Sequence, residues 1–191
     1  MRSLARKPVV AKGVTIGGES PLVCVPVVAQ DEQALLEQAR KNVAVTPDLI
    51  EWRADFFTGV TNPSRLQRAL GLLSQTIGDI PLIFTCRAFA EGGAQAIDHE
   101  TRLSIIETVV KSGVPSLVDV ELSSGEPTVS RVTQMAGAHG LSTILSFHHF
   151  KATPPVELIK DKLVQAQSAG GDIAKVAVMP RSYTDVLDLF R

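Results

Sequence analysis

The sequence predicts a single α/β domain in which helices cover a parallel β-sheet. Three observations predict it: β-rich apolar runs alternate with amphipathic helical patterns, glycines follow the helices, and polar side chains share one face of several strands. A chain of 191 residues with 45% hydrophobic content is long enough to bury one sizeable core. No linker or low-complexity tract divides the sequence, so we expect one domain over residues 1–191.

The first expected elements are a hairpin and a strand. Residues 9–20 are expected to form an N-terminal hairpin, because two short β-rich runs flank Lys12-Gly13. Residues 22–28 are expected to be the first strand of the core. Asp31 is placed to cap the helix that follows, since its short side chain can accept a hydrogen bond from an N–H of the first turn.

The pattern then repeats with short connections. The expected strands are residues 48–54, 82–87, 116–122, 141–147 and 172–179, and the expected helices are residues 63–77, 99–112, 126–139 and 154–169. Glycines follow these four helices, at Gly78, Gly113, Gly140 and Gly170. A left-handed residue often ends a helix at this point, and a further helix is expected to begin near Ser182. Strands and helices that alternate in this way indicate a parallel sheet buried on both sides.

Two architectures fit the alternation, a doubly wound open sheet and a β/α barrel. No glycine-rich phosphate loop follows the first strand, which disfavours a dinucleotide-binding open sheet. Since side chains switch faces at each residue of a strand, five strands place polar groups on one common face. These groups are Glu51, Arg53, Asp55, Thr85, Arg87, Asp119, Glu121, Ser146, His148 and Lys175. In a barrel they converge on one axis and neutralise one another, so we favour the barrel, whose sites lie at the carboxyl ends of the strands.

Lys175 lies in the middle of the apolar run 172–180, which is expected to be a buried strand. An ammonium is costly to bury unless it is paired or loses its proton. A lysine held out of water is a nucleophile for carbonyl carbon. The alternative is an edge strand whose lysine points into water, as most lysines do.

His148 and Glu91 are the next candidates. His148 ends the fifth core strand and is expected to be a general acid/base, the alternative being a histidine at the edge of a loop. Glu91 follows the third strand in Ala90-Glu91-Gly92-Gly93, where it would orient a histidine or remain solvated.

The composition excludes several classes of partner. With 19 basic and 20 acidic residues and no basic tract, no nucleic-acid partner is expected. The longest apolar runs are too short to span a bilayer, and the N-terminus lacks the apolar region of a secretory signal. Cys24 and Cys86 lie in strand-like runs and are expected to be reduced and buried, as in a cytoplasmic protein. Two cysteines without CxxC spacing and four scattered histidines predict no metal site.

Four motifs, in this order, resemble those of type I 3-dehydroquinate dehydratase, the Schiff-base enzyme of the shikimate pathway. They are Glu51-Trp52-Arg53-Ala54-Asp55, Thr85-Cys86-Arg87 with Glu91-Gly92-Gly93, Ser146-Phe147-His148, and Lys175-Val176-Ala177-Val178-Met179-Pro180. The resemblance runs from the N-terminal hairpin through Arg191. It implies a (β/α)8 TIM barrel, usually a homodimer, that works without a metal or cofactor.

The resemblance also implies roles for the candidate residues. Lys175 would form an imine with the C3 ketone of 3-dehydroquinate. His148 would take the proton from C2 and deliver a proton to the departing C1 hydroxyl, and Glu91 matches the acidic residue beside that histidine. Residues that hold the ring hydroxyls of the substrate match Glu51, Arg53 and Arg87. The product would be 3-dehydroshikimate, on the way to the aromatic amino acids.

Length separates this chain from the family pattern. A (β/α)8 barrel typically needs ~250 residues, so we expect about six of the eight βα units here, with strands seven and eight absent. An incomplete barrel of this kind is expected to turn over substrate poorly or to aggregate. Two other functions stay open: a class I Schiff-base aldolase, and a ligand-binding fragment without turnover. A Glu-x-Arg strand and a Glu-Gly-Gly loop fit a cyclic polyhydroxy acid better than a sugar phosphate.

Overall fold

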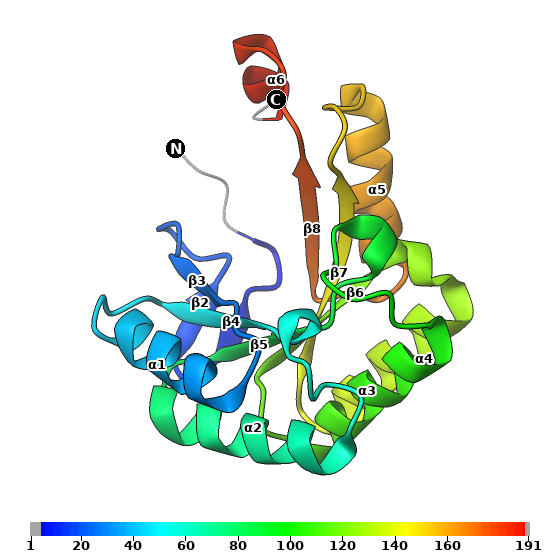
Figure 1. The fold of residues 1–191 in the computed structure, drawn as a ribbon. Coiled ribbons are helices and arrows are strands. Elements are labelled where there is room, and N and C mark those ends of the chain that lie inside the picture. The colour runs from blue at the N-terminus through cyan, green and yellow to red at the C-terminus, as the bar shows by residue number, and fades with distance from the viewer. Residues whose placement is uncertain (1–4, 190–191) are drawn as a thin grey trace.

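The computed structural model describes residues 5–189, and its centre is one curled sheet of six parallel strands (Figure 1). The strands are β3 (Cys24–Val27), β4 (Leu49–Arg53), β5 (Leu82–Thr85), β6 (Leu117–Glu121), β7 (Ser142–His149) and β8 (Ile173–Val178). Each strand pairs with the next one along the chain, in the order β3-β4-β5-β6-β7-β8. A doubly wound sheet reverses its strand order, so this sequential order confirms the predicted barrel-type fold.

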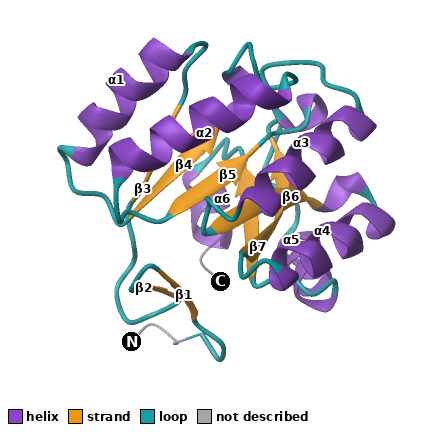
Figure 2. Ribbon diagram, turned by 90° about the horizontal axis from the view of Figure 1, so that it is seen from below, coloured by secondary structure: helices purple, strands orange, loops and turns teal. Residues whose placement is uncertain are grey.

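Helices lie outside the sheet, where Figure 2 shows α1 to α5 in an arc around the strands. They are α1 (Glu32–Val43), α2 (Pro63–Ile77), α3 (His99–Ser112), α4 (Glu126–Ala138), α5 (Val156–Ser168) and α6 (Tyr183–Leu189). The predicted cap is present, because Oδ1 of Asp31 accepts the Ala34 N–H at 2.9 Å. All four glycines predicted to follow helices have positive φ angles, between 60° and 84°. No helix within residues 5–189 is long and apolar enough to cross a membrane.

The outer face of the sheet and the inner sides of the helices form the main core. Trp52, Phe84, Val118 and Leu145 point outward from four successive strands and are fully buried there. This packing explains the apolar half of the alternation along each strand.

The inner face of the sheet changes from apolar to polar along the strands. Near their amino ends, Leu49, Ile83, Leu117 and Ile144 form a second apolar cluster with Ala11. Ala11 belongs to the predicted hairpin, which consists of β1 (Val9–Ala11) and β2 (Val14–Ile16). The hairpin therefore covers the amino end of the inner face, and the polar side chains lie beyond this cluster, towards the carboxyl ends.

Two expectations about burial are wrong. The residues of β8 are only half-buried, because within the described part of the chain β8 pairs with β7 alone. Cys24 is exposed although Cys86 is buried, since β3 is the other edge of the sheet. Strand ends also differ by one or two residues from the predicted bounds. For example, β5 ends at Thr85 because the chain leaves the sheet before Arg87.

Candidate active site

Lys175 points to the inner face of the curled sheet. Its Nζ atom lies 3.0 Å from Oδ2 of Asp119 on β6 and 3.6 Å from Oε1 of Glu51 on β4. The side chain is 35% exposed, so the amine is partly shielded and still open to a ligand. Although β8 is an edge strand in the described chain, its lysine is thus directed at carboxylates and not into bulk water.

Arg87 and Asp119 form a buried ion pair beneath Lys175. Nη1 and Nη2 of Arg87 donate to the two carboxylate oxygens of Asp119 at 2.9 and 3.0 Å. Burial pushes the pKa of Asp119 up, but the charges of Arg87 and Lys175 and the hydrogen bonds from Arg87 and Ser146 lower it to about 2. Asp119 is therefore ionised at neutral pH and places a fixed negative charge beside the amine.

Arg87 also reaches two further groups. Its Nη1 donates to Oε1 of Glu121 and to Oγ of Ser146, each at 2.9 Å. Burial opposes the charge of Arg87, but the neighbouring carboxylates raise its pKa above the ordinary value. Arg87 is 3% exposed, so it holds a fixed cation under the site.

His148 and Glu91 form a dyad at the carboxyl end of β7. Oε2 of Glu91 accepts hydrogen bonds from Nδ1 of His148 at 2.9 Å and from its backbone N–H at 3.0 Å. The hydroxyl of Ser123 donates to Oε1 of the same carboxylate. Burial raises the pKa of Glu91, but the bonds from His148 and Ser123 outweigh it and lower the pKa. Because the ionised carboxylate can only accept, it keeps the hydrogen on Nδ1 and leaves Nε2 free to exchange a proton.

An aromatic ring covers this dyad. The ring of Phe150 stacks on His148 with centroids 5.9 Å apart. Gly92 adopts φ +84°, and a Cβ atom there would meet the Phe150 ring at 2.7 Å. The predicted Glu-Gly-Gly loop thus needs its first glycine both for its backbone conformation and for this contact.

Arg53 and Glu51 complete the predicted set. Nε and Nη2 of Arg53 donate to the two oxygens of Asp55, each at 2.9 Å. Oε1 of Glu51 accepts the Thr85 hydroxyl at 2.7 Å. Strand alternation predicted that Glu51, Arg53, Arg87, His148 and Lys175 share the inner face, and the structure brings them together there and at its carboxyl end. Glu91 was predicted from its loop as a possible partner of a histidine, and it contacts His148.

Two polar residues of this network were not predicted. Arg102 on α3 is 5% exposed and donates to Oε2 of Glu121. Its position could have been found, because it lies in phase with the buried Ile105, Ile106 and Val109 of the same helix. Ser123 lies in the short turn after β6, and nothing in its sequence neighbourhood marks it.

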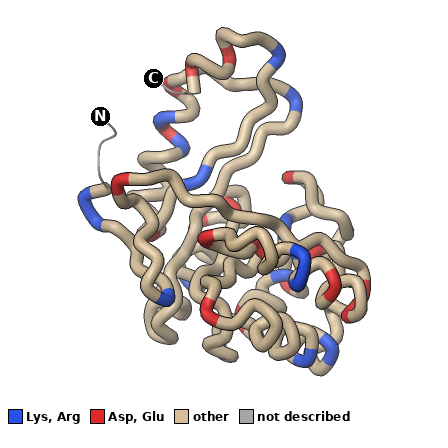
Figure 3. The backbone as a smooth tube through the Cα atoms, turned by 90° about the vertical axis from the view of Figure 1, so that its left-hand side faces the viewer, with Lys and Arg blue, Asp and Glu red and all other residues tan. Residues whose placement is uncertain are grey.

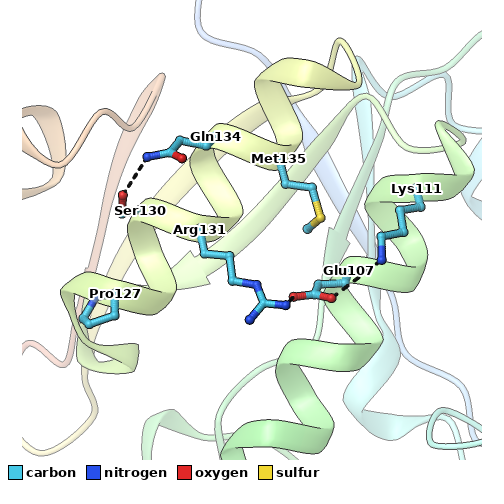
Figure 4. A pocket seen from close by; sticks show the side chains of 7 residues that line it. All are labelled: Glu107, Lys111, Pro127, Ser130, Arg131, Gln134 and Met135. Atoms are coloured by element: carbon cyan, nitrogen blue, oxygen red, sulfur yellow. Dashed lines mark hydrogen bonds and ion pairs between the residues drawn. The ribbon is translucent and has the colours of Figure 1, made fainter.

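A separate hollow of about 580 Å³ lies on the outer helical layer, and none of the candidate site residues lines it (Figure 4). It lies between α3 and α4, where Glu107 pairs with Arg131 at 2.6 Å. Charges elsewhere are mixed, since Figure 3 shows basic and acidic positions distributed among one another along the tube.

The curled sheet of six sequential parallel strands, with its helices outside, has the fold of the β/α-barrel class. A family model described as type I 3-dehydroquinase matches residues 23–191. The chain belongs to this family. The relatives described below are 3-dehydroquinate dehydratases, a class of lyases.

Relatives in sequence cover nearly the whole chain. The 3-dehydroquinate dehydratase of Geobacillus thermodenitrificans is 40% identical over 190 residues, which are 99% of this chain and 74% of the relative. That of Aromatoleum aromaticum is 40% identical over 176 residues, 92% of this chain and 68% of the relative. The chain therefore spans 68–74% of the length of these two relatives.

Solved structures of 3-dehydroquinate dehydratases have the same fold as this chain. The type I 3-dehydroquinate dehydratase of Clostridium difficile, crystallised with covalently modified comenic acid, has a TM-score of 0.93 at 35% identity, over 95% of this chain and 72% of that one. The 3-dehydroquinate dehydratase of Geobacillus kaustophilus has a TM-score of 0.93 at 37% identity, over 96% and 72%. A putative deoxyribose-phosphate aldolase of Toxoplasma gondii shares only the fold, at 11% identity and a TM-score of 0.61. The family match decides against the aldolase alternative.

Proposed function

We propose that this chain dehydrates 3-dehydroquinate to 3-dehydroshikimate through an imine on Lys175. The observation that carries the proposal is the position of Lys175 on β8, next to the strand β7 that carries His148. Its amine points to Asp119 on β6 and Glu51 on β4. An amine nucleophile and an imidazole base thus share one inner face. The activity of the relatives, which are 3-dehydroquinate dehydratases, supports the same reaction.

Lys175 begins the reaction. The Lys175 ammonium first gives a proton to His148, and the neutral amine then attacks the C3 carbonyl carbon. The carbonyl oxygen leaves as water with the proton that His148 returns, which gives a protonated imine. Asp119 remains ionised and lies 3.0 Å from the nitrogen, so it stabilises the positive charge of the ammonium and then of the imine. The cationic imine withdraws electrons from C2, which makes the C2 proton acidic enough to remove.

His148 moves the protons. Its free Nε2 takes the C2 proton, the C1–O bond breaks, and the hydroxyl leaves as water with the proton that the imidazolium returns. Glu91 stabilises the imidazolium between these steps through the bond to Nδ1. Water then hydrolyses the imine, which releases 3-dehydroshikimate and restores the amine.

Glu51, Arg53 and Arg87 are proposed to hold the substrate. Nη1 of Arg53 and Oε2 of Glu51 have no hydrogen-bond partner within the described residues, so both are available to ring hydroxyls. Arg87 has both terminal nitrogens on protein groups, and we assign it the positive charge beneath the polyhydroxylated ring.

The assembly and location of the chain are also proposals. We propose a cytoplasmic homodimer built from one β/α domain per chain, and the support for it is the family resemblance. Light scattering on the purified chain tests the dimer, and a single cooperative unfolding transition tests the single domain.

The test of the function is product formation from 3-dehydroquinate, followed by the absorbance of the conjugated product. Parent protein and Lys160→Ala, an exposed lysine on α5, are expected to form product at equal rates, and Lys175→Ala is expected to form none. Product formation by Lys175→Ala would refute the proposed role of the amine. Thermal stabilisation of the parent by 3-dehydroquinate without product would identify a ligand-binding fragment instead.

A further inference from the structure

Asp55 is a buried carboxylate that the mechanism above does not use. It lies at the end of β4, is fully buried, and accepts four hydrogen bonds from three separate parts of the chain. Two come from the Arg53 guanidinium, and the others come from the backbone N–H groups of Arg87 at 3.3 Å and Ala94 at 3.0 Å. A carboxylate with this many donors is satisfied without any ligand.

The two backbone bonds lie on either side of Glu91. The Arg87 N–H precedes the turn η2 (Phe89–Glu91), and the Ala94 N–H follows it. Asp55 therefore joins both ends of the segment that carries the dyad carboxylate. The segment is tightly wound, because a Cβ atom on Gly93 would lie only 2.2 Å from the Arg87 carbonyl oxygen.

Gln95 strengthens the same attachment. Its Nε2 donates to the Asp55 carbonyl oxygen at 2.7 Å and to the Phe57 carbonyl oxygen at 3.0 Å. The segment is thus held to the end of β4 through both the side chain and the backbone of Asp55.

Asp55 also fixes Arg53. The two carboxylate oxygens of Asp55 accept hydrogen bonds from Nε and Nη2 of Arg53, which orients the planar guanidinium. Nη1 is left as the donor that faces away from the pair. Nη2 also donates to the Gly92 carbonyl oxygen at 3.2 Å, so the guanidinium touches the Glu91 segment as well.

We propose that Asp55 is a positioning residue that sets the Glu91–His148 dyad and the substrate-binding Arg53 as one unit. The inference rests on the proposed function, because it assigns Asp55 to the same site. Asp55 does not touch the reacting atoms; it acts through the Glu91 segment and Arg53. Since general acid–base catalysis depends on the position of the base, a shift of this segment slows proton transfer while Lys175 remains free to form the imine.

The first test is amide hydrogen exchange in Asp55→Asn, with Asp161→Asn, an exposed position on α5, as the matched control. The reporters are the amides of Arg87 and Ala94, which bond Asp55, and the amide of His148, which bonds Glu91. We expect all three to exchange about tenfold faster in Asp55→Asn and unchanged in the control. The amide of Thr101, bonded to Asp98 on α3, is expected to be unchanged in both variants. An unchanged His148 amide would overturn the inference, since the dyad would then be independent of Asp55.

The second test separates positioning from general destabilisation. Protein and 3-dehydroquinate are mixed, reduced with borohydride after set times, and the Lys175 adduct is weighed. The adduct is lighter by one water when dehydration has occurred before reduction. At a 3-dehydroquinate concentration that saturates both proteins, we expect Asp55→Asn to form as much adduct as the parent, with dehydration slower by about 10²-fold. Reduced adduct yield with an unchanged dehydrated fraction would show a merely structural role and overturn the inference.

The same experiment keeps the inference separate from the proposed function. Absence of a Lys175 adduct in the parent would refute the proposed function, whereas the exchange test of Asp55 would still be readable. Should Asp55→Asn fail to fold, Gln95→Ala tests the same attachment through the Asp55 carbonyl. Faster exchange at Ala94 and His148 is expected there too, and an unchanged His148 amide would again overturn the inference.

Discussion

Oε2 of Glu91 accepts two hydrogen bonds from His148, one from ring Nδ1 at 2.9 Å and one from the backbone N–H at 3.0 Å. The two bonds fix the side chain of Glu91 against the very residue whose ring it orients. The imidazole can therefore neither rotate freely nor place its hydrogen on the other nitrogen without losing a bond.

Glu91→Gln keeps the shape of the side chain but removes the charge that stabilises the imidazolium. We expect dehydration to slow by about 10²-fold, because acid–base catalysis by His148 is impaired. The imine on Lys175 should still form. Steady-state rates measure the effect, with Glu19→Gln in an exposed turn as the control. Equal rates for Glu91→Gln and the parent would remove Glu91 from the mechanism.

Ser123→Ala removes the hydroxyl that donates to Oε1 of Glu91. This bond helps to lower the pKa of Glu91, so its loss raises that pKa towards the ordinary value. The carboxyl carbon of Glu91, followed by NMR against pH, should therefore titrate at higher pH in Ser123→Ala than in the parent and return towards the parent's pH in Ser123→Thr. A profile that does not move would show that the hydroxyl has no effect on the dyad.

Asp119 should make the folded chain sensitive to acid. Its pKa is lowered from 3.8 to about 2 in the folded state. Because the folded pKa is the lower one, this stabilisation is fully present above pH 3.8 and is lost as the pH falls towards 2. The shift corresponds to about 2 kcal/mol.

Urea unfolding at several pH values between neutral and acid measures this contribution. Asp119→Asn should be less stable than the parent at neutral pH by about 3 kcal/mol, because Arg87 then loses one of its two buried counter-charges, the bidentate one. It should also lose less stability on acidification, while Asp161→Asn follows the parent. A variant with the acid dependence of the parent would show that other carboxylates cause it.

Arg102→Met should destabilise the protein while every proposed catalytic and substrate-binding residue is retained. Arg102 is buried, and its removal leaves Oε2 of Glu121 without its charged partner, at a cost of about 3 kcal/mol. The exposed pair of Arg68 and Glu32 offers the control, since Arg68→Met should cost less than about 1 kcal/mol. The free energy of unfolding in urea measures both losses of stability. Equal losses in Arg102→Met and Arg68→Met would show that the buried pair of Arg102 and Glu121 contributes no more than an exposed pair.

The sequence was sufficient to predict which side chains share a face. Strand alternation placed Glu51, Asp119 and Lys175 together, because a parallel sheet in sequential order preserves the phase of each strand. Helix bounds were predicted well where caps were clear, as with α2, which begins after Asn62 and ends before Gly78.

The partners within the site were less predictable. Alternation placed Arg53 and Arg87 near Lys175, but which carboxylate each would bind depends on strand stagger and side-chain reach. The structure pairs Arg53 with Asp55 and Arg87 with Asp119 and Glu121, and leaves Asp119 as the group closest to Lys175. Ser123 lies in a turn whose path depends on tertiary contacts, so no local pattern could place it beside Glu91. Cys24 is exposed because it lies on an edge strand, and an apolar run in the sequence does not show which strand lies at the edge of the sheet.

In the proposed mechanism one particular amine, that of Lys175, condenses with the ketone of the substrate. Reduction of the protein with borohydride in the presence of 3-dehydroquinate, followed by proteolysis and mass mapping, tests it directly. We predict one reduced adduct, on the peptide that contains Lys175, and none in Lys175→Ala. An adduct on a different lysine, or product formation with no adduct at all, would contradict it.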